Sequence, residues 1–201
     1  MSITRELRPA LSLVVLFTIL TGFILPEAFT GAMQLALPFQ ANGSLLIVNG
    51  QVVGSALIGQ NFTSAKYFQP RPSALTGTDA MGNSISTPYD ASESGASNLG
   101  PASASLLQSV QLRVAAYRKA FGPGPVPADA VTASGSGIDP DISLANALRQ
   151  APAVAAARHL DDAKVTALVN QMAHGSVLGI VGTQHVNVLQ LNLALDRMSA
   201  P

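Results

Sequence analysis

An uncharged stretch near the N-terminus constrains this chain more than any other feature. No charged residue occurs between Pro9 and Pro26, and only Glu27 interrupts the apolar character that continues to Leu37. A helix of roughly 20 apolar residues is long enough to span the ~30 Å hydrocarbon core of a bilayer. The stretch therefore predicts one transmembrane helix over residues 9–33.

The basic residues beside this stretch predict its orientation. Arg5 and Arg8 precede it, and the next basic residue is Lys66. Lys and Arg near a span favour the cytoplasmic side of the membrane. We therefore expect residues 1–8 to be cytoplasmic and residues 34–201 to form a single extracytoplasmic domain.

A cleaved secretory signal is the alternative interpretation of the same stretch. Arg5 and Arg8 suit a positive n-region, residues 10–25 suit an h-region, and Thr30-Gly31-Ala32 is an acceptable cleavage site. The apolar character is long for a signal peptide, which favours a retained anchor. Glu27 is expected at the outer headgroup level, and Pro26 is expected to kink the helix.

Composition excludes several classes of function. The 201 residues carry 11 basic and 11 acidic side chains, and this neutral balance argues against nucleic-acid binding, which needs clustered basic charge. The chain has no cysteine, so disulfides, thiolate metal sites and cysteine nucleophiles are ruled out. Charged residues make up 11% of the chain, which is low and hints that partners cover much of the surface.

A hairpin and a long loop are expected after the anchor. Residues 44–48 and 52–58 are β-branched and apolar, and Asn49-Gly50 between them is a strong hairpin signal. Residues 69–98 lack periodicity and are rich in Pro, Gly, Ser and Asn, which predicts an ordered surface loop of about 30 residues.

Helical periodicity dominates the C-terminal half. Residues 101–121 show apolar spacing of three and four up to Gly122-Pro123. Pro140 is expected to open a helix that runs to about Gln150 and is ended or kinked by Pro152. Asp161 is expected to cap a further helix with Val165, Leu168, Val169 and Met172 on its core face. Residues 186–198 fit a strand first and a helix later, with helix favoured overall, so the domain is predicted to be mixed α/β.

Ser134-Gly135-Ser136-Gly137 is the segment most suggestive of a binding site. A small Gly-rich turn before a helix can hold an anion on its N–H groups. It is not a Walker A loop, because no Gly-Lys-Ser/Thr follows, nor is it Gly-x-Ser-x-Gly. Ser134, Gly135, Ser136 and Gly137 are thus weak candidates for nucleotide binding, and a tight turn that leads into a helix at Asp139 is the alternative.

Histidines and a compact aromatic cluster add two further hypotheses. Ser134 or Ser136 with one of the three histidines could build a hydrolase triad, but no spacing selects one, and no metal-ligand motif is present. We therefore predict no catalytic residue and no metal site. Tyr67, Phe68 and Arg71 suit either a docking surface or a strand end that packs on the core.

Several linked blocks of residues appear in order over nearly the full length of the chain. They are Thr30-Gly31, Gln40-Ala41-Asn42-Gly43-Ser44, Val53-Gly54-Ser55, Leu57-Ile58-Gly59-Gln60-x-Phe62, Tyr67-Phe68-x-x-Arg71-Pro72-Ser73-Ala74, Ser97-Asn98-Leu99-Gly100-Pro101, Val126-Pro127, Val131 through Pro140, and Val186-Asn187-Val188-Leu189-x-Leu191-Asn192. Together these blocks resemble the C subunit of the bacterial Kdp potassium-transporting P-type ATPase. Departures from the family pattern are local, at Asp90, Ala96 and Asp141.

The resemblance implies a non-enzymatic accessory subunit of a potassium uptake complex in the bacterial inner membrane. It implies three partners, namely an ATP-hydrolysing subunit, a channel-like potassium-translocating subunit and a small single-helix subunit. It also implies a role in assembly and as a catalytic chaperone that raises the ATP affinity of the hydrolysing subunit. ATP would act in the complex, and the chain would hold no cofactor of its own. The rivals are a membrane-anchored or secreted cell-envelope hydrolase and a binding protein released from its signal peptide.

Overall fold

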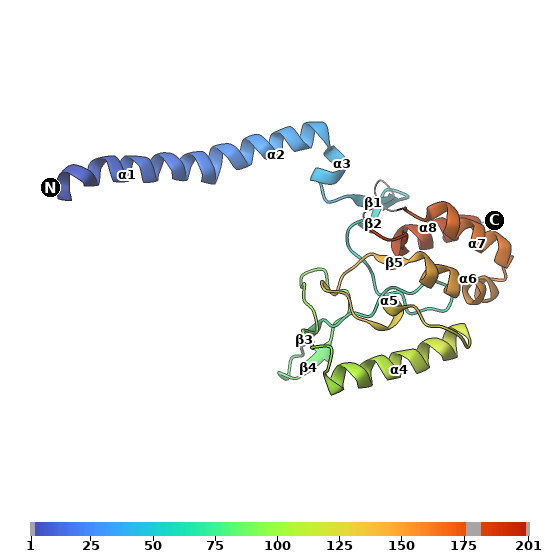
Figure 1. The fold of residues 1–201 in the computed structure, drawn as a ribbon. Helices are drawn as coiled ribbons and strands as arrows, with labels where there is room; N and C mark the ends of the chain where they lie inside the picture. Colours follow the sequence, from blue (N-terminus) through green and yellow to red (C-terminus); the bar gives the residue numbers. More distant parts are fainter. Residues whose placement is uncertain (1–2, 176–181, 200–201) are drawn as a thin grey trace. The chain divides into compact units, whose positions relative to one another are not determined.

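The computed structural model describes residues 3–175 and 182–199, and the chain divides into two compact units, Met1–Val53 and Gly54–Pro201 (Figure 1). The first unit begins with a long helix built from α1 (Ile3–Ile19), a π-helical segment η1 (Leu20–Ile24) and α2 (Leu25–Ala36). Its stretch Arg5–Ala36 is long and apolar enough to cross a membrane, by length and composition. The predicted span over residues 9–33 lies inside it.

The π-helical segment ends at Ile24, two residues before Pro26. Proline has no N–H to donate to the carbonyl four residues earlier, so the regular hydrogen-bond ladder cannot continue through it. Instead the N–H of Leu25 donates to the carbonyl of Leu20, five residues back. The Thr21 hydroxyl donates to the carbonyl of Phe17 at 2.6 Å. The expected loosening at Pro26 therefore takes the form of one widened turn within a continuous helix.

The first unit ends in the predicted hairpin. After α3 (Pro38–Ala41), β1 (Leu45–Val48) pairs with β2 (Gln51–Ser55). Asn49 and Gly50 both have positive φ, of 51° and 77°, which is the backbone pattern of a type I′ turn. This turn matches the right-handed twist of the flanking strands.

The loop predicted over residues 69–98 contains more structure than expected. β3 (Thr76–Thr78) and β4 (Ser84–Ser86) pair antiparallel within it. Asp79 closes their turn, because its carboxylate accepts from the N–H groups of Met81 and Asn83. The strands carry only one large apolar residue, Ile85, so hydrophobic alternation could not predict them.

The helix predicted over residues 101–121 is α4 (Ala104–Phe121). The Ser103 hydroxyl caps its N-terminus by accepting from the N–H of Leu106, and Gly122 ends it with a φ of 87°. A short helix, α5 (Ala128–Val131), follows the Pro/Gly connector. These boundaries agree with the predicted stop at Gly122.

The predicted helix at Pro140 is wrong at both ends. Residues Asp141–Ser143 form strand β5, and α6 runs from Leu144 to Arg158 with the Ser143 hydroxyl as its cap. Pro152 lies inside α6 rather than ending it. An interior proline costs about 3 kcal/mol, and the burial of Ala151, Val154 and Ala155 on either side of it offsets that cost.

The last elements are α7 (Asp162–Met172), β6 (His185–Asn187) and α8 (Val188–Ser199). Asp161 caps α7 as expected, by accepting from the N–H of Ala163, and Val165 and Val169 are buried. The ambiguous C-terminal segment holds both elements, a strand that pairs antiparallel with β5 and then a helix.

Figure 1 shows α6, α7 and α8 packed together beside β5. The core of the second unit lies among them and includes Phe68, Ile142, Val154, Val186, Leu191 and Leu195.

Two buried amide side chains attach residues 68–69 to this core. The Asn192 side chain accepts from the N–H of Phe68 at 2.9 Å and donates to its carbonyl at 3.0 Å. Gln150 does the same for Gln69, at 2.7 and 3.1 Å. Buried backbone groups need partners, so these amides replace the neighbouring strand that residues 68–69 lack.

Candidate functional site

The segment singled out by sequence, residues 134–137, is a turn that is largely bonded within the domain. It lies between α5 and β5. Ser134 is 2% exposed, its N–H donates to the carbonyl of Pro72, and its hydroxyl accepts from the N–H of Gly137 at 2.9 Å. The Ser136 hydroxyl accepts from the N–H of Ile138 at 3.2 Å. Both serine side chains therefore stabilise the turn itself.

The two glycines of this turn have different surroundings. Gly137 has a φ of 74°, and a Cβ placed on it would lie 2.5 Å from the Leu75 Cγ. Gly135 is exposed and has no neighbour within 4 Å of the corresponding position. Only Gly137 is thus required by the fold at this point.

The donors that remain available in the turn are few. The N–H groups of Ser134, Gly137 and Ile138 are already bonded. Among the described residues, the N–H groups of Gly135 and Ser136 have no such bond. An anion that binds this turn would therefore rest on these two N–H groups.

Beside the turn, Arg71 and Asp139 form an ion pair. The Arg71 Nη1 lies 2.8 Å from the Asp139 Oδ2, and about a quarter of each side chain is exposed. The second Asp139 oxygen accepts from the N–H of Asp141 at 3.1 Å. The turn therefore does not lead into a helix at Asp139, as the sequence predicts, because the Asp139 carboxylate organises the entry to strand β5 instead.

Tyr89 joins this pair to the long loop. Its hydroxyl donates to the carbonyl of Arg71 at 2.8 Å, and its backbone has a φ of 63°, which is unusual for a tyrosine. Burial, followed by the charge of Asp139, raises the pKa of Tyr89 well above its usual value. A Cβ on Gly59 would lie 2.5 Å from the Tyr89 ring and 2.6 Å from the carbonyl of Asp139, so a glycine is needed there.

Two shallow cavities of about 440 and 450 Å³ flank Arg71. Aromatic and proline side chains line the first, among them Tyr89 and Tyr117. Acidic groups line the second, among them Asp129 and Asp141. Asp129 is itself engaged, since it accepts from the N–H and the hydroxyl of Ser143 and from the Asn146 side chain.

The histidines lie apart from the serine turn. His174 and His185 form an antiparallel bridge, with stacked rings 5.7 Å apart, and His159 ends α6. In the described part of the chain, no histidine hydrogen-bonds to Ser134 or Ser136, and no three acidic or histidine side chains are grouped to hold a metal ion. The geometry offers no serine triad among these residues.

The compact aromatic cluster of Tyr67, Phe68 and Arg71 makes its contacts within the second unit. Phe68 is completely buried in the core, the Arg158 guanidinium lies 4.7 Å from the Tyr67 ring centroid, and Arg71 is paired as described. Of the two interpretations left open by the sequence, packing on the core describes Phe68, whereas Tyr67 and Arg71 are half-buried outside the core cluster.

Asp141, which lines the second cavity, gives a testable prediction about how stability depends on pH. Burial raises this pKa, and the nearby His185 opposes the shift, with its Nε2 3.9 Å from the Asp141 Oδ2. A raised carboxyl pKa stabilises the fold below the unfolded-state pKa, and that stabilisation is lost as pH rises through the folded-state value. We expect Asp141→Asn to raise the free energy of unfolding at pH 7 and to have little effect near pH 3. Urea unfolding at the two pH values checks this, with exposed Glu93→Gln as the control; equal effects of Asp141→Asn at both values would contradict it.

Three of the blocks that carry the family resemblance meet at this place in the fold. The N–H of Gly59 donates to the carbonyl of Ile138, that of Gly95 to the carbonyl of Ser136, and that of Ser134 to the carbonyl of Pro72. Segments about 40 to 80 residues apart thus share one hydrogen-bonded junction. Sequence reasoning found most of these segments, including the block that holds Gly59, but it missed Tyr89, the residue against which Gly59 packs, because no local motif marks Tyr89.

Comparison with known proteins identifies the family. The family described as "K+-transporting ATPase, c chain" (KdpC) matches residues 7–197. A "Potassium-transporting ATPase KdpC subunit" of Mycobacterium tuberculosis is 50% identical over 197 residues, which cover 96% of this chain and 99% of the relative. Proteins with the same description in Methylobacterium nodulans and Allorhizobium ampelinum are 48% and 47% identical, over 97% of this chain and 98% and 97% of theirs. The match includes both the long helix and the second unit, and the chain therefore belongs to the KdpC family of potassium-transporting ATPase subunits.

Proposed function

We propose that this chain is a non-catalytic accessory subunit that is needed for assembly of the potassium-transporting ATPase. It acts there as a catalytic chaperone, by raising the affinity of the ATP-hydrolysing subunit for ATP. The observation that carries the proposal is the family match over residues 7–197, which covers the apolar helix and the second unit together. Its partners are the ATP-hydrolysing subunit, the channel-like potassium-translocating subunit and the small single-helix subunit.

The proposed location is the bacterial inner membrane, with the N-terminus in the cytoplasm. Arg5 and Arg8 support this orientation, since no other basic residue occurs before Lys66. The second unit then lies outside, on the membrane face opposite to the ATP. Its effect on ATP affinity is a conformational coupling of about 1–3 kcal/mol, which corresponds to roughly 5- to 150-fold.

Direct nucleotide binding by residues 134–137 is the alternative route to the same effect. It requires the second unit to face the cytoplasm, and it would use the N–H groups of Gly135 and Ser136 described above. The inward hydrogen bonds of Ser134 and Gly137 favour the indirect route.

Protease access tests the orientation. We expect protease added to intact spheroplasts to digest the chain beyond about residue 40, because the second unit faces outward. A tag before Arg5 should stay protected until the membrane is permeabilised. Protection of the second unit in intact spheroplasts would contradict the proposed topology.

ATP titration tests the role in the complex. We expect the ATP-hydrolysing subunit purified without this chain to need about 5- to 150-fold more ATP for half-maximal hydrolysis than the same subunit needs in the complete complex. Ser136→Ala in the full chain is the matched control and should leave this value unchanged. An unchanged ATP requirement in the absence of the chain would contradict the chaperone role.

A further inference from the structure

Two histidines form a bridge beside the second of the two cavities. His174 follows the end of α7, and His185 begins β6 and lines that cavity. Each donates its backbone N–H to the carbonyl of the other, at 2.8 and 3.1 Å, and their rings stack with centroids 5.7 Å apart. Because His185 also pairs with Ser143 of β5, the bridge joins the chain after α7 to the strand pair β5–β6.

Hydrogen bonding fixes which nitrogen of the His185 ring is free. Its Nδ1 lies 2.9 Å from the carbonyl oxygen of Thr183, and a carbonyl can only accept, so the neutral ring carries its proton on Nδ1. The unprotonated Nε2 lies 3.9 Å from the Asp141 Oδ2. Two acceptors therefore face each other without a hydrogen between them, at a distance too long for a hydrogen bond.

One proton on this Nε2 turns the contact into an attraction. The imidazolium then donates to the Asp141 carboxylate, and charge-assisted bonds of this kind close to about 2.7–2.9 Å. Histidine is the side chain whose charge ordinarily changes between about pH 5 and pH 8. The length of this contact therefore depends on pH within the range that bacteria meet.

The other acidic groups near Asp141 already have partners. Asp139 and Asp129 are engaged as described above, the first with an arginine and the second with the start of α6. Among the described residues, the titratable groups that act on Asp141 are His185, Asp139 and His174. Of these, His185 is the one that makes an ion-pair contact with it, so the charge of His185 decides the state of this contact.

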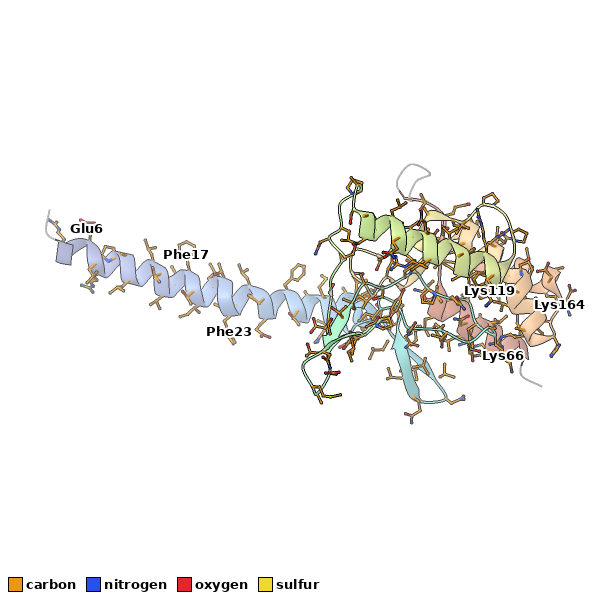
Figure 2. All side chains as sticks on the ribbon, turned by 90° about the horizontal axis from the view of Figure 1, so that it is seen from below. Glu6, Phe17, Phe23, Lys66, Lys119 and Lys164 are labelled. Atoms are coloured by element: carbon orange, nitrogen blue, oxygen red, sulfur yellow. The ribbon has the colours of Figure 1, made fainter. Side chains whose placement is uncertain are left out.

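The charged groups of the helices packed on this region are directed elsewhere. On α6, Arg149 bonds to the carbonyl of Gly122, and Arg158 pairs with Asp196 of α8. The remaining ones are exposed at helix ends away from the bridge; they are His159, Asp161, Asp162, Lys164 and Arg197. Figure 2 shows Lys164, with Lys66 and Lys119, at the surface of the second unit. No described group on these helices therefore competes with His185 for the Asp141 carboxylate.

We propose that His185 and Asp141 form a proton-operated latch. A proton on the His185 Nε2 closes the gap to the Asp141 carboxylate, and the bridge, with the chain after α7, is thereby fastened onto β5. With the second unit on the outer face, the medium outside the cell sets the pH that this latch meets. The latch itself is a property of the chain alone and does not depend on the proposed function.

The latch also has a lower limit of pH. Burial raises the pKa of Asp141, which His185 opposes and Asp139 reinforces, so this carboxylate takes a proton at a higher pH than an ordinary aspartate. A second proton on the bridge, at His174, would place two like charges on the stacked rings. Both changes weaken the contact, so the latch is closed over a window of mildly acidic pH and opens on either side of it.

Amide hydrogen exchange tests the latch, measured by NMR on the full chain in detergent micelles. Rates are corrected for the intrinsic effect of pH, and EDTA is present so that no metal ion takes the place of the proton. We expect the amides of His174 and His185 to exchange about 2- to 5-fold more slowly at pH 6 than at pH 7.5, the range of a partly exposed ion pair. The reference is the amide of Val169, which is buried in α7, and the added protection should be lost by pH 4.5.

Two variants and one control separate the latch from other effects of pH. Asp141→Asn and His185→Gln each remove one partner, and the difference between pH 6 and pH 7.5 should disappear in both. His159→Asn removes an exposed histidine with a left-handed backbone that asparagine tolerates, and it should keep the difference. Bridge amides that gain no protection relative to Val169 at pH 6, or a gain that persists in Asp141→Asn, overturn the inference.

Discussion

Replacing Asn192 by leucine should cost about 2–6 kcal/mol of unfolding free energy. The Asn192 side chain satisfies both the N–H and the carbonyl of Phe68, and Asn192 is 1% exposed. Leucine has a similar volume but neither donor nor acceptor, so two buried backbone groups lose their partners at about 1–3 kcal/mol each. Urea unfolding of the full chain in detergent, followed by circular dichroism, measures this loss.

Asn170 offers the control for this prediction. Its side chain donates to the carbonyl of Thr166 within α7, but it is exposed, so water can replace the bond. Asn170→Leu should change stability by no more than about 0.5 kcal/mol. Similar losses for the two variants would show that the Phe68 contacts contribute no more than a surface bond.

Gly137→Ala should destabilise the second unit by about 2–4 kcal/mol. A left-handed backbone costs a non-glycine residue about 1–2 kcal/mol, and Gly137 has a φ of 74°. The added Cβ would also lie 2.5 Å from the Leu75 Cγ and 3.0 Å from the carbonyl of Gly95, which forces a local shift. Thermal unfolding of the purified chain measures the loss.

Gly135→Ala is the matched control, two residues away in an open position. We expect it to change stability by less than about 0.5 kcal/mol and to leave the ATP requirement of the complex unaltered. A fall in ATP affinity for Gly135→Ala at normal stability would instead support direct nucleotide binding by the turn.

Sequence patterns anticipated the elements whose signals are local. The long apolar helix, the Asn49-Gly50 hairpin, the stop at Gly122 and the Asp161 cap each rest on a few neighbouring residues, and each lies close to where it was expected. The prediction that a helix begins at Pro140 was wrong, because the side chain that caps this helix is that of Ser143, three residues later. The prediction that Pro152 ends the helix was wrong for a different reason, since the packing of α6 on the core outweighs the local cost of an interior proline.

The candidate site was predictable only in part. Ser134-Gly135-Ser136-Gly137 was visible as a Gly-rich turn, but whether its hydroxyls face a ligand or the turn depends on contacts with Pro72 and Gly95. Tyr89 and Asn192 act across about 20 and 120 residues of chain, and no local pattern marks them. Polar residues such as Gln150 and Asn192 on apolar helix faces are the one signal that could have indicated these buried amide pairs.

The widened turn at Leu20–Ile24 alters how one helix meets its neighbours. A π-helical turn holds one residue more than an α-helical turn, and each residue of an α-helix advances ~100° around the axis. The side chains of α2 are therefore rotated by about a quarter-turn relative to an uninterrupted continuation of α1. A stripe of side chains that faces one adjacent helix along α1 therefore points in another direction along α2, so this one helix can contact two neighbouring helices in succession.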